Sequence, residues 1–230
     1  MRHEILGSPD FTSARITFEQ AGESCVAESG AMVARSGGIQ MKTAMRGGLL
    51  AAAKRKMLGG ESLFQNTFTA TAAGQELLLA PAPEGDLQSR ILQPNEPFFL
   101  QSGAYVAHMG DALNIDTSWG GAKGFFSGMG LFLLKIVGPG TVLYGSYGAI
   151  HAVEVDGSYI CDTDHIVGFT SGLTYNITKF GGFKSLFLSG EGLVCHFSGR
   201  GTLLLQTRNP PSLANFLERY RRVEKSSSND

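Results

Sequence analysis

The stretch Ser29-Gly30-Ala31-Met32-Val33-Ala34 decides the fold, because nearly the same six residues return later in the chain. The second copy reads Ser102-Gly103-Ala104-Tyr105-Val106-Ala107, and a weaker third copy reads Thr163-Asp164-His165-Ile166-Val167-Gly168. The copies start at residues 29, 102 and 163. A motif that recurs at such intervals indicates repeated structural units.

Further landmarks follow each copy in the same order. An alternating, strand-like segment comes first, at residues 39–43, 113–117 and 173–177, and a turn with a closing strand comes last, at residues 74–79, 139–144 and 200–205. We therefore predict three β modules, at about residues 22–80, 98–145 and 159–207. Modules of this length bury little surface alone, so they are expected to pack as one domain over residues 1–225 with pseudo-threefold symmetry. Residues 226–230 are predicted to be a disordered tail.

Composition agrees with an all-β sandwich. The 230 residues include 31 glycines, and most apolar segments are short and end at glycine, asparagine or aspartate. Many short strands separated by such turn signals are typical of a sandwich or barrel. The Gly-x-Gly pieces, such as Gly138–Gly140 and Gly199–Gly201, are interpreted as hairpin turns, because they lack the third glycine of a dinucleotide-binding loop.

Two segments are predicted to be helical. Residues 49–58 are rich in helix formers and stop at Gly59-Gly60. Near the C-terminus, Leu213, Phe216, Leu217 and Tyr220 recur at helical spacing, which predicts a helix near residues 213–225 with Ser212 as its N-cap and Pro210-Pro211 excluding an earlier start. This second helix is expected either to lie on the sandwich or to form a subunit contact.

Several segments together resemble a known family. They are Gly22-Glu23-Ser24, Ala27–Met32, Gly59-Gly60-Glu61-Ser62-Leu63-Phe64, Gln101–Tyr105 and Gly199-Arg200-Gly201-Thr202. Over residues 2–209 the chain resembles the altered-inheritance-of-mitochondria (mitochondrial biogenesis) family and its uncharacterised bacterial members. The resemblance implies a β-sandwich like that of the tryptophan RNA-binding attenuation protein. It implies no catalytic residues, and it associates the mitochondrial members with inner-membrane organisation.

Net charge, cysteine spacing and the absence of known motifs exclude several classes of function. A net charge of −1 gives no overall attraction to nucleic acid, and three widely spaced cysteines indicate reduced thiols in a cytoplasmic protein. No nucleophile elbow, Walker loop or paired-histidine spacing occurs. We therefore predict no catalytic, cofactor or metal site and no enzymatic activity. Asp162-Thr163-Asp164-His165 is read as an Asx turn that leads into a strand.

Two groups of residues are candidate contact sites. The basic group could meet an anionic membrane surface or a phosphate, although we prefer to interpret it as a solvated helix face; it contains Arg46, Lys54, Arg55 and Lys56. The aromatic group could stack on bases, enter a membrane interface or, as we prefer, form subunit contacts; it contains Trp119, Phe125, Phe126, Phe180 and Phe183.

The sequence is compatible with three functions. The first is a non-enzymatic oligomeric scaffold or binding module, with a membrane surface or another protein as possible partner and a membrane-peripheral location as one option. The second is RNA or nucleotide binding, which rests on fold analogy alone. The third is a cupin-like metal-dependent enzyme, which would need two of His108, His165 and His196 to converge with an acid.

Overall fold

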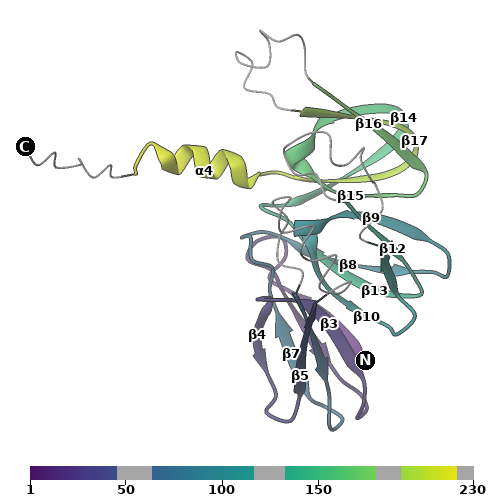
Figure 1. The fold of residues 1–230 in the computed structure, drawn as a ribbon, viewed down its shortest axis with the longest axis vertical. Helices are drawn as coiled ribbons and strands as arrows, with labels where there is room; N and C mark the ends of the chain where they lie inside the picture. The colour runs from purple at the N-terminus through teal and green to yellow at the C-terminus, as the bar shows by residue number, and fades with distance from the viewer. Residues whose placement is uncertain (46–63, 117–132, 180–192, 222–230) are drawn as a thin grey trace, which may run out of the picture.

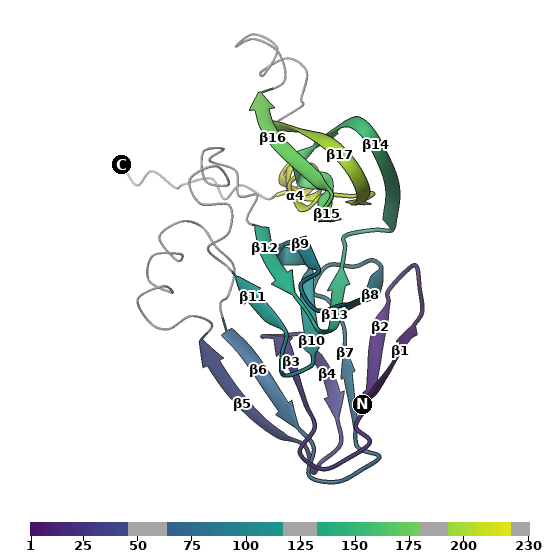
Figure 2. The ribbon, with the colours of Figure 1, turned by 90° about the vertical axis from the view of Figure 1, so that its right-hand side faces the viewer.

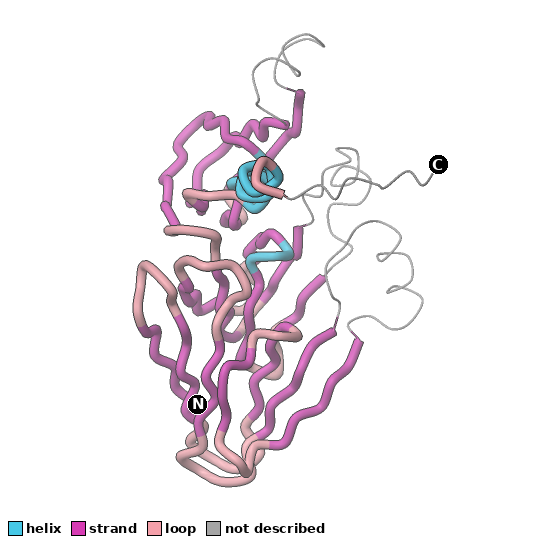
Figure 3. The backbone as a smooth tube through the Cα atoms, turned by 90° about the vertical axis from the view of Figure 1, so that its left-hand side faces the viewer, coloured by secondary structure: helices cyan, strands magenta, loops and turns pink. Residues whose placement is uncertain are grey.

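The computed structural model describes residues 1–45, 64–116, 133–179 and 193–221. Strands make up nearly all of this part of the chain, and Figure 3 shows how little of the tube is helical. The helix predicted near residues 49–58 and the tail at 226–230 lie outside the described residues. The prediction of an all-β fold is confirmed.

The strands fall into three sets along the chain. The first set is β1 (Arg2–Leu6), β2 (Ser13–Thr17), β3 (Ser24–Glu28), β4 (Met32–Arg35), β5 (Gln40–Met45), β6 (Phe64–Thr69) and β7 (Glu76–Leu79). The second set is β8 (Leu87–Leu92), β9 (Pro97–Gln101), the 3-10 turn η1 (Ser102–Ala104), β10 (Tyr105–Met109), β11 (Asn114–Asp116), β12 (Leu133–Val137) and β13 (Gly140–Gly145). The third set is β14 (Ile150–Asp162), the 3-10 turn η2 (Thr163–His165), β15 (Ile166–Thr170), β16 (Leu173–Lys179) and β17 (Leu193–Gln206).

The same pairing pattern occurs in all three sets. In module 1, β7 lies between β2 and β4, while β6 lies between β3 and β5. In module 2, β13 lies between β8 and β10, while β12 lies between β9 and β11. In module 3, the second half of β17 lies between the first half of β14 and β15, and its first half lies between the second half of β14 and β16. Each module therefore contains two three-stranded layers of equivalent strands.

The module boundaries differ in one respect from the sequence-based ones. Each module gains a first strand that precedes the predicted start, namely β2, β8 or the first half of β14. Residues 81–97, which lie between the first two predicted modules, contain the strand β8. Gly199–Gly201 is not a hairpin turn, because it lies inside the 14-residue strand β17. Gly138–Gly140 is not one either, since β12 and β13 belong to different sheets.

Strand pairing also joins successive modules. β3 of module 1 pairs with β10 of module 2, and β9 of module 2 pairs with β15 of module 3. These two joints merge the layers into a six-stranded sheet and a seven-stranded sheet, and they leave a four-stranded sheet at the start of the chain. The modules follow one another in a row along the long axis, with β4 in the lowest tier and β14 in the highest (Figure 1).

The hydrophobic core runs through the joints. The core of module 3 combines Ile166, Phe169 and Phe197 with Phe99 and Leu133, which come from module 2. The Phe99 and Phe169 rings stack across the joint with their centroids 4.9 Å apart. Burying aromatic side chains at such a seam is strongly stabilising, so neighbouring modules share one core.

The C-terminal helix differs from its prediction in place and in length. α4 spans Pro210–Glu218, with Asn209 as N-cap and the two prolines in its first turn. Proline is tolerated there because the first N–H groups of a helix have no partner within the helix. α4 buries none of its residues and points away from the sheets (Figure 1), so the expectation that it lies on the sandwich is wrong.

Candidate functional site

All the candidate contact residues from the sequence lie outside the described residues. This holds for the basic group Arg46, Lys54, Arg55 and Lys56 and for the aromatic group Trp119, Phe125, Phe126, Phe180 and Phe183. The described strands show only where these segments attach, which is between β5 and β6, β11 and β12, and β16 and β17. These are equivalent positions in the three modules, so the two predictions stay predictions.

The first joint carries a small polar cluster. The buried Tyr105 hydroxyl lies 2.7 Å from His108 Nδ1 and 3.2 Å from the carbonyl oxygen of Val26, and it accepts a hydrogen bond from Gln65 Nε2 at 3.2 Å. Tyr105 and His108 belong to module 2, whereas Val26 and Gln65 belong to module 1. The cluster therefore ties two modules together, which is a structural use of a histidine.

Two shallow surface pockets occur among the described residues. One lies beside the first joint and is lined by Ser24, Val26, His108, Gly110, Asp111 and Leu113. The other lies on the outer face of β16 and β17 and is lined by Thr174, Tyr175, Asn176, Thr178, His196 and Ser198. Hydroxyl, amide and imidazole groups dominate the second pocket, and its lining contains no carboxylate that could work with His196 as an acid–base pair.

The histidines named in the metal hypothesis lie in different surroundings. His108 contacts Tyr105, while His165 is engaged by Gln206 and Asn209. His196 lines the second pocket on the outer face of β17. Within the described ranges, no three His, Cys, Asp or Glu side chains come close enough to hold a metal ion. The described residues thus offer the cupin-like hypothesis no ligand set.

The acidic segment before β15 is a turn, as predicted. Asp162 Oδ1 accepts a hydrogen bond from the backbone N–H of Asp164 at 2.8 Å, which closes an Asx turn at the start of η2. Burial and the neighbouring Asp162 charge both raise the pKa of Asp164. A raised carboxyl pKa can mark a catalytic acid, but here the adjacent chain geometry accounts for it.

His165 fixes the base of α4. His165 Nδ1 donates to the Gln206 carbonyl oxygen at 2.7 Å, and Nε2 accepts from Asn209 Nδ2 at 2.8 Å. The Asn209 side-chain oxygen accepts from the backbone N–H of Ser212 at 2.8 Å. One amide thus caps the helix and binds the imidazole of η2, so it links the projecting helix to module 3.

Replacing Asn209 with alanine should loosen α4 without unfolding the sheets. Loss of the N-cap costs about 1 kcal/mol of helix stability, and α4 has no buried residues to compensate. We expect faster amide hydrogen exchange in residues 212–218 and an unchanged melting temperature of the β modules. Asn215→Ala, in the same helix, is the matched control and should slow exchange slightly, because alanine is the better helix former. Unchanged amide hydrogen exchange in Asn209→Ala would show that Asn209 does not stabilise α4 as its N-cap.

Two cysteines that are distant in sequence are neighbours in the structure. Cys161 of β14 lies directly opposite Cys195 of β17 in the strand register, a proximity that sequence spacing gave no means of finding. All three cysteines are free thiols. Burial raises the pKa of Cys25, Cys161 and Cys195 to about 12 in each case. Because the thiolate is the nucleophile, these groups are poorly suited to catalysis.

The thiols should therefore react slowly in the native protein. A pKa of about 12 instead of about 9 leaves roughly a thousandfold less thiolate at pH 8. We expect a disulfide reagent such as Ellman's to modify the native protein at least about 100-fold more slowly than the guanidinium-unfolded chain, which should release three equivalents. A single fast native equivalent would instead reveal an activated cysteine, with partly buried Cys161 as the first residue to test by serine substitution.

Asp86 is the buried polar residue that sequence reasoning missed. Its side chain is among the few polar ones in the described core, at 2% exposure. Asp86 Oδ1 accepts hydrogen bonds from Ser8 Oγ and from the Leu87 N–H, each at 2.9 Å, and Oδ2 accepts from Gln88 Nε2 at 2.9 Å. The backbone of Asp86 also bonds Gly148 and Ser146. Asp86 thus holds together the segments that connect all three modules.

No helix among the described residues is both long enough and apolar enough to cross a membrane.

The comparisons with known proteins agree with this architecture. The family model for mitochondrial biogenesis AIM24 matches residues 3–208 of the chain. The chain belongs to the AIM24 family. The resemblance seen in the sequence is thereby confirmed, and it extends over all three modules.

Two streptococcal relatives support the assignment. An uncharacterised protein of Streptococcus pyogenes serotype M6 is 31% identical over 228 residues, covering 96% of this chain and 91% of that protein. The crystal structure of a Streptococcus pyogenes protein is similar at 29% identity with a TM-score of 0.75, covering 96% of this chain and 99% of that one. The fold of this chain is therefore shared with the solved streptococcal protein.

Proposed function

We propose that this AIM24-family protein is a non-enzymatic scaffold that assembles with copies of itself and binds partners through exposed apolar elements. One observation carries the proposal. Eight of the eleven exposed large apolar side chains among the described residues lie on just three elements: Met32 and Val33 on β4, Tyr159 and Ile160 on β14, and Leu213, Phe216, Leu217 and Tyr220 on or just after α4.

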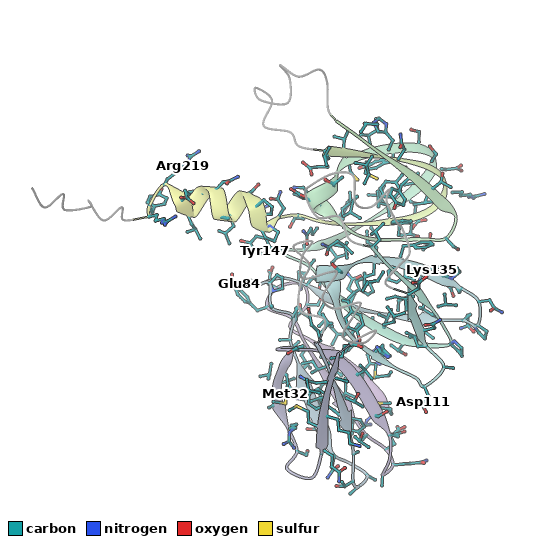
Figure 4. All side chains as sticks on the ribbon, viewed as in Figure 1. Met32, Glu84, Asp111, Lys135, Tyr147 and Arg219 are labelled. Atoms are coloured by element: carbon teal, nitrogen blue, oxygen red, sulfur yellow. The ribbon has the colours of Figure 1, made fainter. Side chains whose placement is uncertain are left out.

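Exposed apolar side chains gathered on a few surface elements are typical of surfaces used for association. Figure 4 places Met32 at the lowest tier and Arg219 at the far end of the projecting α4, so these elements lie well apart. A protein with several separate contact surfaces can join more than one partner at once. In contrast, His108, Asp162 and His165 are committed to a joint, a turn and a helix base, which favours a structural role over catalysis.

Self-association is tested by the mass of the full chain in solution. We expect sedimentation velocity and light scattering to show species larger than the 24.5 kDa monomer, growing with concentration between about 1 and 100 µM. A constant monomer mass over that range would overturn the oligomeric part of the proposal. Phe216→Ser and Leu217→Ser test the contribution of α4, with Asn215→Ser as the control on the same helix.

A peripheral membrane role is a separate part of the proposal. It rests on the basic segment with Lys54, Arg55 and Lys56, which carries three positive charges in a row. We expect the protein to float with vesicles containing 30% phosphatidylserine and to stay behind with neutral phosphatidylcholine vesicles. Changing all three residues to glutamine should release it. No flotation of the unaltered protein with anionic vesicles would remove the membrane part and leave the scaffold part in place.

A further inference from the structure

The two ends of the module row carry the same strand edges that join the modules internally. At each internal joint, the second strand of one module (β3 or β9) pairs with the third strand of the next (β10 or β15). The equivalent second strand of module 3 is residues 158–162 of β14, and the equivalent third strand of module 1 is β4. Within the described residues, β4 pairs only with β7, and residues 158–162 pair only with β17.

We propose that these two free edges pair with each other between copies of the chain, so that residues 158–162 of one molecule continue into β4 of the next. The partner is thus a second copy of this chain, bound head to tail. This proposal rests on the self-association proposed above and specifies its interface.

Both internal joints use the same register. At the first joint, Ala107 lies opposite Ala27, and at the second, Gly168 lies opposite Leu100. Ala107 and Gly168 are the last residues of the second and third copies of the repeated six-residue motif, and Ala34 is the last residue of the first. Ala27 and Leu100 each lie one residue before the end of their strand, as Cys161 does in β14. The intermolecular pair is therefore Ala34 opposite Cys161, which places Arg35 opposite Ile160.

Side chains at equivalent positions differ in exposure between the internal joints and the two ends of the row. Val33 is 57% exposed, whereas the matching Val106 and Val167 at the internal joints are 1% and 0% exposed. Ile160 is 53% exposed, whereas the matching Phe99 is 7% exposed. The valine of the motif is thus buried at both joints and Phe99 is buried at the second, whereas their counterparts Val33 and Ile160 are exposed at the two ends. Covering them with another copy would bury this surface in the same way.

The edges also lack the usual protection against pairing. Natural edge strands are commonly blocked by lysine, proline or bulges that turn the edge away. β4 reads Met-Val-Ala-Arg and residues 158–162 read Ser-Tyr-Ile-Cys-Asp, with neither lysine nor proline in either strand. β4 does carry a register shift against β7, but β10 and β15 carry the equivalent shift and still pair with the preceding module.

Charge favours this pairing as well. In the inferred register, Arg35 faces Ile160, and Asp162 lies two residues along the same face of β14. Diagonal neighbours across an antiparallel pair are about 7–8 Å apart, within reach of an arginine side chain. Opposite charges therefore lie on the two sides of the seam, and Arg35 would add Asp162 to the carbonyl oxygens of Ser36 and Ile39 that it already bonds.

The geometry of the chain requires different molecules to provide the two edges. β4 and residues 158–162 of β14 belong to the first and last modules, at opposite ends of the row (Figures 1 and 2). Because the two edges are different surfaces, the contact is heterologous. Such contacts produce rings when the rotation closes and filaments when it does not.

A complementation experiment tests the inference. Val33→Lys blocks the β4 edge and Ile160→Lys blocks the β14 edge, because a lysine at a strand edge opposes pairing. We expect each variant alone to remain monomeric at concentrations at which the unaltered protein assembles, with association weakened at least 10-fold. An equimolar mixture should form a 1:1 dimer and stop there, since one free β4 edge and one free β14 edge remain. Circular dichroism should show that both variants fold.

Ile91→Lys is the matched control. Ile91 is 66% exposed on β8, an edge strand of a kind that joins no modules, so this variant should assemble like the unaltered protein. If the unaltered protein assembles and both edge variants still do, the edges are not the interface, although the scaffold proposal survives. If the mixture of folded, monomeric edge variants gives no dimer, the contact is not head to tail. A monomeric unaltered protein overturns this inference together with the oligomeric proposal.

Discussion

Asp86→Ala is expected to destabilise the protein by about 3 kcal/mol or more, lowering its melting temperature by roughly 6–12 °C. The Asp86 carboxylate is 2% exposed and accepts three close hydrogen bonds, from Ser8, Leu87 and Gln88. Truncation to alanine leaves the buried Leu87 N–H without its acceptor, which costs about 1–3 kcal/mol, and it also removes the part-buried bonds from Ser8 and Gln88. Urea unfolding followed by circular dichroism measures the free-energy change.

The loss of stability in Asp86→Ala should extend beyond the residues that contact Asp86. Ser8 belongs to the β1–β2 connection of module 1, while Leu87 begins β8 of module 2. The backbone of Asp86 bonds Ser146 and Gly148, in the connection from module 2 to module 3. We therefore expect hydrogen-exchange protection to fall in all three connections. Removing the carboxylate takes an acceptor directly from the first two segments. The third segment bonds only the Asp86 backbone, so it loses protection through movement of that backbone.

Asp156→Ala provides the matched control for Asp86→Ala. The Asp156 side chain is 82% exposed and lies 3.9 Å from an equally exposed Arg200. An exposed ion pair of this kind contributes little, so we expect a change below about 0.5 kcal/mol. Asp86→Asn keeps one acceptor oxygen and should fall between the two. A loss for Asp86→Ala no larger than that for Asp156→Ala would show that the carboxylate does not hold the connections together.

Gly168→Val is expected to open the joint between modules 2 and 3. A Cβ atom at Gly168 would lie 2.6 Å from the carbonyl oxygen of Phe99 and 3.3 Å from the Phe98 ring. The first of these atoms is backbone, so relief requires β9 and β15 to separate. That movement would also part the Phe99 and Phe169 rings, which stack 4.9 Å apart. We expect a loss of about 3 kcal/mol or more, since overpacking and lost aromatic contact add together.

The expected signature is loss of cooperativity between modules. With the joint open, module 3 should unfold before the others, giving two calorimetric transitions where the unaltered protein gives one. Gly37→Val is the control, because an added Cβ at Gly37 meets nothing within 4 Å. A single, unshifted transition in Gly168→Val would mean that the joint is not tightly packed. The same joint is our template for contact between molecules, so its rigidity also bears on assembly.

Some of this architecture could be predicted from the sequence because the signals are local. The repeated Ser-Gly-Ala-x-Val-Ala motif places a turn before each third strand, and the observed turns η1 and η2 lie there in modules 2 and 3. The segments predicted as strands at residues 39–43, 74–79 and 139–144 correspond to β5, β7 and β13 in the structure. Strand periodicity and turn chemistry depend on neighbouring residues, so one chain suffices to read them.

Other features depend on residues far apart in the chain. β17 continues through Gly199 and Gly201 because both its halves find long partners in β14, whereas local rules favoured a turn there. Asp86 becomes a buried hub only when the connections of three modules meet around it. From the sequence, Pro210-Pro211 was expected to exclude a helix start before Ser212. In the structure, Asn209 supplies the cap that places both prolines in the first turn of α4.

The sequence by itself determined the repeated β modules and the membership of the AIM24 family, because the order of motifs and the pattern of strands can be recognised without knowing any tertiary contact. Only the tertiary structure decided that the modules join edge to edge in an open row. The physical reason is that a strand edge is defined by what lies beside it, and those neighbours are set by pairing between residues such as Ala27 and Ala107. The same pairing leaves Val33 and Ile160 uncovered at the two ends, where the next molecule is expected to bind.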